Sequence, residues 1–352
     1  MALLCLFAAP AFTSNTESNH SGVVIDKDGT VRIPAFKMPL SIYMSDGAKR
    51  SYIERSSLLQ KGLPADVAKQ HEIWTHFFLD PARAAYSVET QKQQMGGVPT
   101  LVFLPKAGVT SKNRDRVLIN LHGGGFNSKT PDINEWAESL PIAAVARIKV
   151  VSVEYRQAPE FKFPAASEDV AQVYRALLKV YKPQNIGIYG CSAGGLLTAM
   201  SIAWFQKEQL PTPGAIGIFC AGATYPIGGD SAYSAPPFDG GPAPAVQPNP
   251  PAWGTMEYLS NANPDSPLVS PGLHPEVAAK FPPTLIITGT RDIAMSWAVH
   301  TQSLLVRAGV SVELHVWEGM PHAFMYSVDI PESKEMYAVT AKFFDTHLGG
   351  VR

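Results

Sequence analysis

The pattern of hydrophobic positions predicts helices near the start of the chain. Between residues 40 and 83, the segments Ser51–Gln60 and Pro64–Phe78 carry apolar residues at helical spacing, and strand signals are few. Further along, Gly96-Gly97 separates two strand-like runs, which is typical of a hairpin turn. The regular structure is therefore expected to begin with helices and a hairpin.

From residue 116 onward, short apolar runs alternate with helical segments, a pattern typical of parallel strands joined by crossover helices. Strands in such a sheet are buried on both faces, so their runs are continuously apolar. The expected strands include the two runs of the hairpin, Tyr86–Gln93 and Val98–Leu104. The strands expected after them are Arg116–Leu121, Lys149–Tyr155, Asn185–Gly190, Ala215–Cys220, Thr284–Thr290 and Ser311–Trp317. The expected helices are Asp132–Arg147, Pro164–Tyr181, Ala193–Gln209, Ser296–Ala308 and Glu332–His347. We therefore expect an α/β fold with a mostly parallel sheet flanked by helices.

One interval breaks this alternation. Residues 222–283 are rich in proline and glycine and contain no strand-like run. Loops this long in a compact domain usually carry function, and this one falls between two strands of the expected sheet. We predict a core formed by residues 86–221 and 276–352, and a mainly helical cap formed by residues 13–85 and the insertion 222–275.

The composition is that of a globular protein, with 45% hydrophobic and 17% charged residues. The 29 basic and 30 acidic residues nearly cancel, so no electrostatic field favours a nucleic acid or an anionic membrane as partner. The chain has three cysteines, and no clustered His, Cys or acidic spacing suggests a metal site. We expect neither a metal nor another cofactor.

The first residues form a short apolar run, Met1–Pro10, followed by small residues. This pattern fits a signal peptide that ends near residue 12, and it fits an uncleaved apolar N-terminus equally well. The first alternative predicts a periplasmic or secreted protein and the second a cytoplasmic one. No other segment approaches the length needed to span a bilayer, so stable membrane insertion is not expected.

Candidate chemistry begins at Gly190-Cys191-Ser192-Ala193-Gly194, which fits the pattern G-x-S-x-G between an expected strand and an expected helix. A nucleophilic serine can project from such a sharp turn only if its neighbours are small. A structural glycine turn with a capping serine would give the same local pattern. The motif therefore makes Ser192 a candidate nucleophile.

A second motif, His122-Gly123-Gly124-Gly125, follows the strand that ends at Leu121. Glycines permit positive φ angles and close approach of backbone N–H groups to a ligand. The amides of this loop, together with that of Ala193, can stabilise an oxygen that becomes negative in the transition state.

Asp292 and His322 each follow an expected strand, and the order Ser192, Asp292, His322 is the one expected for a serine hydrolase of this fold. Their predicted roles are nucleophile for the serine, general base for the histidine, and orientation of that histidine for the aspartate. The competing histidines lie within or near the end of a helix or strand, where packing or solvation explains them: His300, His315 and His347. The competing aspartates lie in the irregular interval, with no strand to fix them: Asp230, Asp239 and Asp265.

Taken together, these motifs resemble the hormone-sensitive-lipase-like esterases, family IV of the bacterial lipolytic enzymes. The resemblance rests on HGGGF (His122–Phe126), YRQAPE (Tyr155–Glu160), FPAA (Phe163–Ala166), GCSAGG (Gly190–Gly195), TGTRD (Thr288–Asp292) and GMPHAF (Gly319–Phe324). It implies the α/β-hydrolase fold and a serine carboxylesterase for short-to-medium acyl esters, with a dimer plausible. It also implies oxyanion donors at the amides of Gly124, Gly125 and Ala193, and supporting roles for His122, Gly123 and Glu160.

Three departures from the family leave the substrate open. Cys191 stands where Asp is frequent, Gln157 replaces the usual Leu, and Ser296 replaces a second Asp. Lactones and acetylated sugars or drugs are alternative substrates, and a peptidase or a ligand receptor on the same fold is disfavoured. The aromatic residues Phe238, Trp253 and Tyr258 suggest either an apolar pocket or packing within the cap.

Cys191 beside the serine raises two further alternatives. A cysteine nucleophile is disfavoured, because Ser192 occupies the central position of the turn. A disulfide between Cys191 and Cys220 is conceivable, because both residues end neighbouring strands.

Overall fold

The computed structural model describes residues 22–239 and 256–349. The possible signal peptide (residues 1–12) and Trp253 lie outside this part. The chain divides at Leu40 into two units. In the first, β1 (Val24–Ile25) and β2 (Val31–Arg32) pair as an antiparallel hairpin, which the hydrophobic pattern did not predict.

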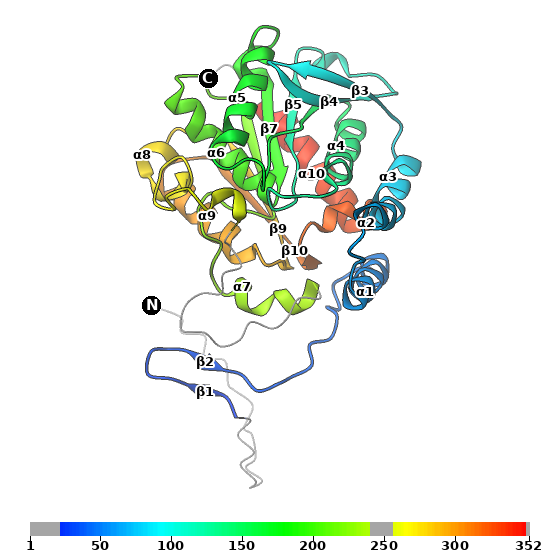
Figure 1. Ribbon diagram of the computed structural model, residues 1–352, viewed down its shortest axis with the longest axis vertical. Helices are drawn as coiled ribbons and strands as arrows, with labels where there is room; N and C mark the ends of the chain where they lie inside the picture. Colours follow the sequence, from blue (N-terminus) through cyan, green and yellow to red (C-terminus); the bar gives the residue numbers. More distant parts are fainter. Residues whose placement is uncertain (1–21, 240–255, 350–352) are drawn as a thin grey trace, which may run out of the picture. The chain divides into compact units, whose positions relative to one another are not determined.

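The second unit is built on an eight-stranded sheet in the order β10-β9-β8-β7-β5-β6-β4-β3 (Figure 1). The antiparallel pairs are β3 with β4 and β4 with β6, and the other neighbours are parallel. The strands are β3 (Val88–Met95), β4 (Val98–Pro105), β5 (Val117–Leu121), β6 (Lys149–Val153), β7 (Ile186–Cys191), β8 (Ala215–Phe219), β9 (Thr284–Arg291) and β10 (Val312–Pro321). All the strands predicted from the sequence are present.

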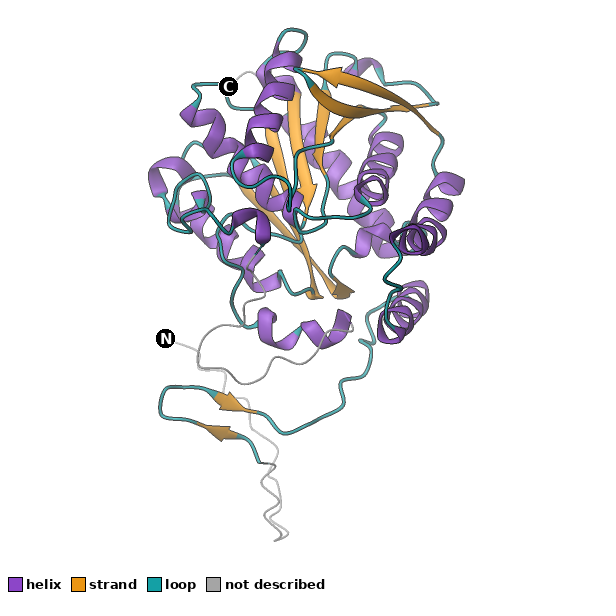
Figure 2. Cartoon of the chain, viewed as in Figure 1, coloured by secondary structure: helices purple, strands orange, loops and turns teal. Residues whose placement is uncertain are grey.

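Helices cover both faces of this sheet (Figure 2). One face carries α4 and α10, which pack on each other, and the other carries α5 and α6; α9 packs on β9 and β10. The bounds are α4 (Pro131–Ala146), α5 (Ala165–Leu178), α6 (Ala193–Lys207), α9 (Met295–Arg307) and α10 (Pro331–His347). Strands β5, β7 and β8 are buried along their whole length, as their continuous apolar runs predict.

The segments expected to form a cap are mainly helical in the described part of the chain. They contain α1 (Asp46–Lys61), α2 (Val67–Trp74), a π-helical turn (Thr75–Leu79), α3 (Asp80–Ala85), α7 (Ser231–Ser234) and several 3₁₀ turns, and α8 (Pro275–Ala278) follows directly. The Tyr52 hydroxyl of α1 donates a hydrogen bond of 2.7 Å to the carbonyl of Phe238. The N-terminal cap segment and the cap insertion therefore contact each other. The boundaries between this cap and the core stay a prediction.

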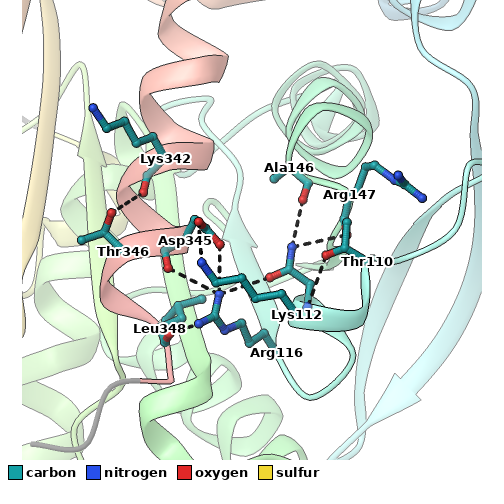
Figure 3. A network of polar contacts seen from close by, with 10 residues as sticks. Thr110, Lys112, Arg116, Ala146, Arg147, Lys342, Asp345, Thr346 and Leu348 are labelled. Atoms are coloured by element: carbon teal, nitrogen blue, oxygen red, sulfur yellow. Dashed lines mark hydrogen bonds and ion pairs between the residues drawn. The ribbon is translucent and has the colours of Figure 1, made fainter.

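The end of the sheet where β5 begins is held to the C-terminal helix by an ionic cluster (Figure 3). Lys112 and Arg116 bind the carboxylate of Asp345 at 2.6 and 3.2 Å, and Arg116 also donates to the carbonyl of Leu348. Hydrogen bonding from Lys112, followed by the charges of both cations, holds the pKa of Asp345 below its usual value. This cluster fixes α10 at the edge opposite the carboxyl ends of the parallel strands.

Among the described residues, no helix is both long enough and apolar enough to cross a lipid bilayer.

Candidate active site

Ser192 lies on a strained turn between β7 and α6. Its φ and ψ are 56° and −120°, a conformation that L residues rarely adopt. The turn is tight: a Cβ atom on Gly194 would lie 1.7 Å, and one on Gly190 2.2 Å, from the carbonyl oxygen of Leu121. Contact with β5 therefore requires the small residues of the G-x-S-x-G pattern. The alternative of a glycine turn with a capping serine does not explain the strain, because the Ser192 side chain makes no capping hydrogen bond.

The glycine loop leaves the sheet beside this turn, because Leu121 of β5 pairs with Gly190 of β7 in the sheet register. Gly124 and Gly125 have φ values of 111° and 66°. Within the described residues their N–H groups donate to no acceptor. The amide of Ala193 is one of the first of α6, which have no acceptor within their own helix. These donors are free to bind a developing oxyanion.

His122, the first residue of the glycine motif, packs against the loop and is 1% exposed. Its ring stacks on Tyr155 at 4.4 Å, and its Nδ1 lies 2.8 Å from the carbonyl oxygen of Gly123. Burial lowers the pKa of His122 to about 4. The imidazole is therefore neutral, and its contacts serve the shape of the loop.

Asp292 and His322 form a hydrogen-bonded pair, with Oδ1 and Nδ1 separated by 2.7 Å. Asp292 is fully buried and also accepts hydrogen bonds from Thr288 Oγ1 and the Ala294 amide, both at 2.8 Å. Burial acts to raise the pKa of Asp292, but the charge and hydrogen bond of His322 outweigh it and hold the pKa below its usual value. Burial acts to lower the pKa of His322, and Asp292 outweighs it and raises that pKa.

A register shift in β10 places this histidine. The strand runs on to Pro321 with an irregularity between Trp317 and Pro321, and Gly319 adopts a φ of 77°. The Gly319 amide donates a 2.7 Å hydrogen bond to Thr290 Oγ1 at the end of β9. The loop that carries His322 is thus fixed to the strand that carries Asp292.

Both described cysteines are free thiols, so the conceivable disulfide between them is absent from this structure. The donor atoms of Cys220, Asp292 and His322 lie within 4.8 Å of one another, which is the spacing of a metal site. Burial raises the pKa of the Cys220 thiol well above its usual value, and the carboxylate and imidazole already bind each other. The cluster therefore suits an acid–base pair better than a metal.

Strand β8 and the residue after it connect the Ser192 turn to the loop that carries His322. The Ser192 amide donates to the Phe219 carbonyl at 2.8 Å, and the next residue, Cys220, accepts a 3.4 Å hydrogen bond from the Ala323 amide. In the described part of the chain, no hydrogen bond joins Ser192 Oγ to the His322 imidazole. In unliganded hydrolases this contact is often long and tightens when substrate binds.

A cavity of about 250 Å³ lies next to the glycine loop and the His322 loop, although neither Ser192 nor His322 is among its lining residues. Its lining contains Leu59, Trp74, Phe78, Ile133 and Tyr326, with Asn134 and Ala323 at the sides of the glycine loop and of His322. Phe238 and Tyr258 are not among the lining residues; Tyr258 stacks on Phe126 at 4.6 Å, which favours packing over substrate contact.

Arg55 of α1 also lines the cavity. Its guanidinium donates to the carbonyl oxygen of His322 at 2.8 Å and pairs with Asp239 at 3.3 Å. No sequence pattern connects these two residues, because Arg55 belongs to an expected helix and Asp239 to the irregular interval. Only their placement shows that both lie against the histidine loop.

Glu160, expected to support the site, lies in an exposed turn. It makes no hydrogen bond or ion pair with any other described residue, so the structure does not bring it to the candidate site. In the same motif, Arg156 binds Asp169 at 2.8 Å and fixes the connection between β6 and α5.

Comparison with protein-family models matches residues 118–326, more than half of the chain, to the alpha/beta hydrolase fold family. The chain belongs to this family. An acetyl-hydrolase of Streptomyces hygroscopicus is 27% identical to this α/β-hydrolase over 286 residues, covering 77% of this chain and 91% of that protein. The versiconal hemiacetal acetate esterase of Emericella nidulans is 27% identical over 274 residues, covering 75% and 91%.

Solved structures give the same result for this α/β-hydrolase. The crystal structure of esterase E25 superposes with a TM-score of 0.74 at 27% identity, covering 90% of this chain and 98% of that one. An esterase from the bacterial hormone-sensitive lipase family superposes with a TM-score of 0.72 at 25% identity, covering 87% and 99%. The predicted family resemblance, fold class and ester-hydrolase class are therefore confirmed.

Proposed function

We propose that this α/β-hydrolase is a serine carboxylesterase that cleaves esters of short-to-medium acyl chains through an acyl-enzyme on Ser192. One observation carries the proposal: the strained serine turn, the free amides of the glycine loop and the buried Asp292–His322 pair all lie at the carboxyl ends of neighbouring strands. This is the set of groups that acyl transfer requires.

In the proposed mechanism, His322 accepts the Ser192 proton as Oγ attacks the ester carbonyl. The amides of Gly124, Gly125 and Ala193 bind the oxyanion, an effect of about 3 kcal/mol for each donor. His322 then protonates the leaving alcohol, and a water molecule hydrolyses the acyl-enzyme by the same route. Asp292 fixes the histidine tautomer and stabilises the imidazolium.

The cavity supports a compact substrate. An apolar cavity of about 150 Å³ can hold benzene, so the 250 Å³ observed here offers room for a short or branched chain or an aryl group. Its walls are mainly apolar and offer no excess charge, since Arg55 is already paired with Asp239. We therefore propose uncharged short-chain esters rather than long-chain lipids.

Acetyl esters are a second candidate within this class. The small cavity favours them, and the two curated relatives described above are named for acetyl groups: an acetyl-hydrolase and an acetate esterase. Lactones remain an alternative on the same site.

The test is a panel of p-nitrophenyl esters, acetate to palmitate, with lactones and amides alongside. We expect turnover of acetate and butyrate, little of palmitate, and a loss of roughly 10³–10⁶ in His322→Ala, as for triads generally. His300→Ala is the matched control, because His300 is exposed on α9. Equal turnover by the two variants would remove His322 from the mechanism.

A further inference from the structure

Glu138 is a buried carboxyl group beneath the candidate active site. It lies on α4, is 4% exposed, and accepts four hydrogen bonds. Oε1 accepts from the Gly123 amide at 2.8 Å and from the Tyr326 hydroxyl at 2.6 Å. Oε2 accepts from Asn120 Nδ2 at 2.9 Å and from the Cys191 amide at 3.2 Å. Burial raises the pKa of Glu138 to about 7, and these four hydrogen bonds act against that rise. The ionised carboxylate has about four acceptor positions, and the four contacts fill all of them.

These partners belong to three separate parts of the site. Gly123 comes directly before the two glycines whose amides are free, Cys191 comes directly before the nucleophile, and Tyr326 lines the cavity. The first two also lie in contact, because a Cβ atom on Gly123 would be 3.1 Å from the Cys191 carbonyl oxygen. One carboxylate therefore connects the glycine loop, the serine turn and a wall of the cavity.

We propose that Glu138 is a positioning residue for ester hydrolysis, which fixes the glycine-loop amides relative to Ser192 by holding the Gly123 and Cys191 amides on one rigid group. The inference rests on the proposed function. A misplacement of about 1 Å in a reacting group can cost roughly 10²-fold in rate, so such a link has a measurable effect on turnover.

The requirement is for a carboxylate and not merely for a polar group of this size. All four contacts come from N–H or O–H groups. The amide nitrogen of a glutamine would therefore face hydrogen-bond donors whether it took the position of Oε1 or that of Oε2. Glu138→Gln keeps the volume and disrupts at least one of the two links. Glu138→Asp keeps the charge and moves it back by one methylene.

Glu135 provides a matched control on the same helix. It lies nearly one turn earlier, it is also 4% exposed, and its Oε1 has no hydrogen-bond partner among the described residues. Its carboxyl makes no hydrogen bond to the glycine loop or the serine turn. Burial raises the pKa of Glu135 to about 8. Glu135→Gln is therefore the same substitution in a buried carboxyl group at the same depth, without the link.

The experiment compares kcat, KM and the affinity of a trifluoromethyl ketone, whose adduct with a serine carries an oxyanion, in the unsubstituted protein and in these variants. Active sites are counted with a fluorophosphonate. For Glu138→Gln we expect kcat per active site and ketone affinity to fall together by roughly 10–100-fold, with KM changed far less. Glu135→Gln should match the unsubstituted protein in all three.

Native kcat and native ketone affinity in Glu138→Gln would overturn the inference, as would a loss that disappears once active sites are counted. If that variant does not fold, Glu138→Asp decides: an intermediate loss supports the inference and native values overturn it. Absence of any ester turnover by the unsubstituted protein contradicts the proposed function instead, so the two failures are distinguishable.

Discussion

Gly124→Ala is the substitution that most directly tests the role of the glycine loop. Gly124 has a φ of 111°, and a Cβ atom there would lie 2.5 Å from Ser128 Cβ and 2.7 Å from Asn134 Nδ2. Asn134 cannot simply swing aside, because its Nδ2 is bonded to the Gly123 carbonyl at 3.1 Å and to Ser128 Oγ at 3.3 Å. The loop itself must move.

The size of the movement gives the expected effect. Ordinary contact begins near 3.4 Å, so the 2.5 Å separation from Ser128 Cβ requires a shift of about 0.9 Å. A shift of about 1 Å in a group that stabilises the transition state costs roughly 10²-fold in rate, or about 2.7 kcal/mol. We therefore expect kcat to fall about 100-fold, with KM little changed because the ground-state ester depends less on the oxyanion donors.

The assay is steady-state hydrolysis of p-nitrophenyl butyrate, normalised to sites labelled by a fluorophosphonate. Gly97→Ala is the control, because Gly97 also has a positive φ of 85° but has nothing within 4 Å of an added Cβ. That control should cost about 1–2 kcal/mol of conformational strain and leave kcat unchanged. A Gly124→Ala enzyme with native kcat would refute the assignment of this amide to the oxyanion site.

Three further predictions follow from the site. Because Asp292 raises the pKa of His322, kcat/KM should fall as the pH drops through a value above the ordinary 6.5. Asp292→Asn should move this acidic limb of the pH profile to lower pH. An acidic limb that does not move would argue against coupling between Asp292 and His322. Arg55→Ala should lower kcat about tenfold, because it releases the His322 carbonyl and allows a displacement smaller than 1 Å. Arg50→Ala, an exposed change on the same helix, should leave kcat unchanged. Equal kcat values for the two variants would contradict this role of Arg55. Cys191→Ala should keep most of the activity, because the buried Cys191 thiol contacts Met325 Sδ at 3.9 Å and the Cys220 thiol, and neither partner belongs to the proposed triad. An inactive variant would revive a role for the thiol.

The centre of the sheet follows from the sequence because strands β5 and β7 are buried along their whole length and each ends at a motif. Strand β5 runs into the glycine loop and β7 into the serine turn, so their hydrophobic runs predict both the sheet and the edge where the chemistry gathers. Asp292 and His322 follow β9 and β10 in the same way, which is why they were predicted and are found hydrogen-bonded.

Other features depend on packing that no local pattern reports. Strands β1 and β2 have two residues each, too few for an alternating pattern to appear. Glu138 lies within the helix expected over residues 132–147, and no sequence pattern distinguishes it. Its buried carboxyl is satisfied by hydrogen-bond donors from three distant segments. Asp239 was set aside because no strand fixes it, but Arg55 of the N-terminal helix does so.

The central claim is that acyl transfer occurs through Ser192, and trapping the acyl-enzyme tests it most directly. The protein is mixed with excess p-nitrophenyl acetate, quenched in acid within the first turnover, digested and analysed by mass spectrometry. The account predicts one acetyl group, carried by Ser192 and absent from Ser192→Ala. An acetyl group on Cys191 instead, or ester turnover that persists at the native rate in Ser192→Ala, would contradict it.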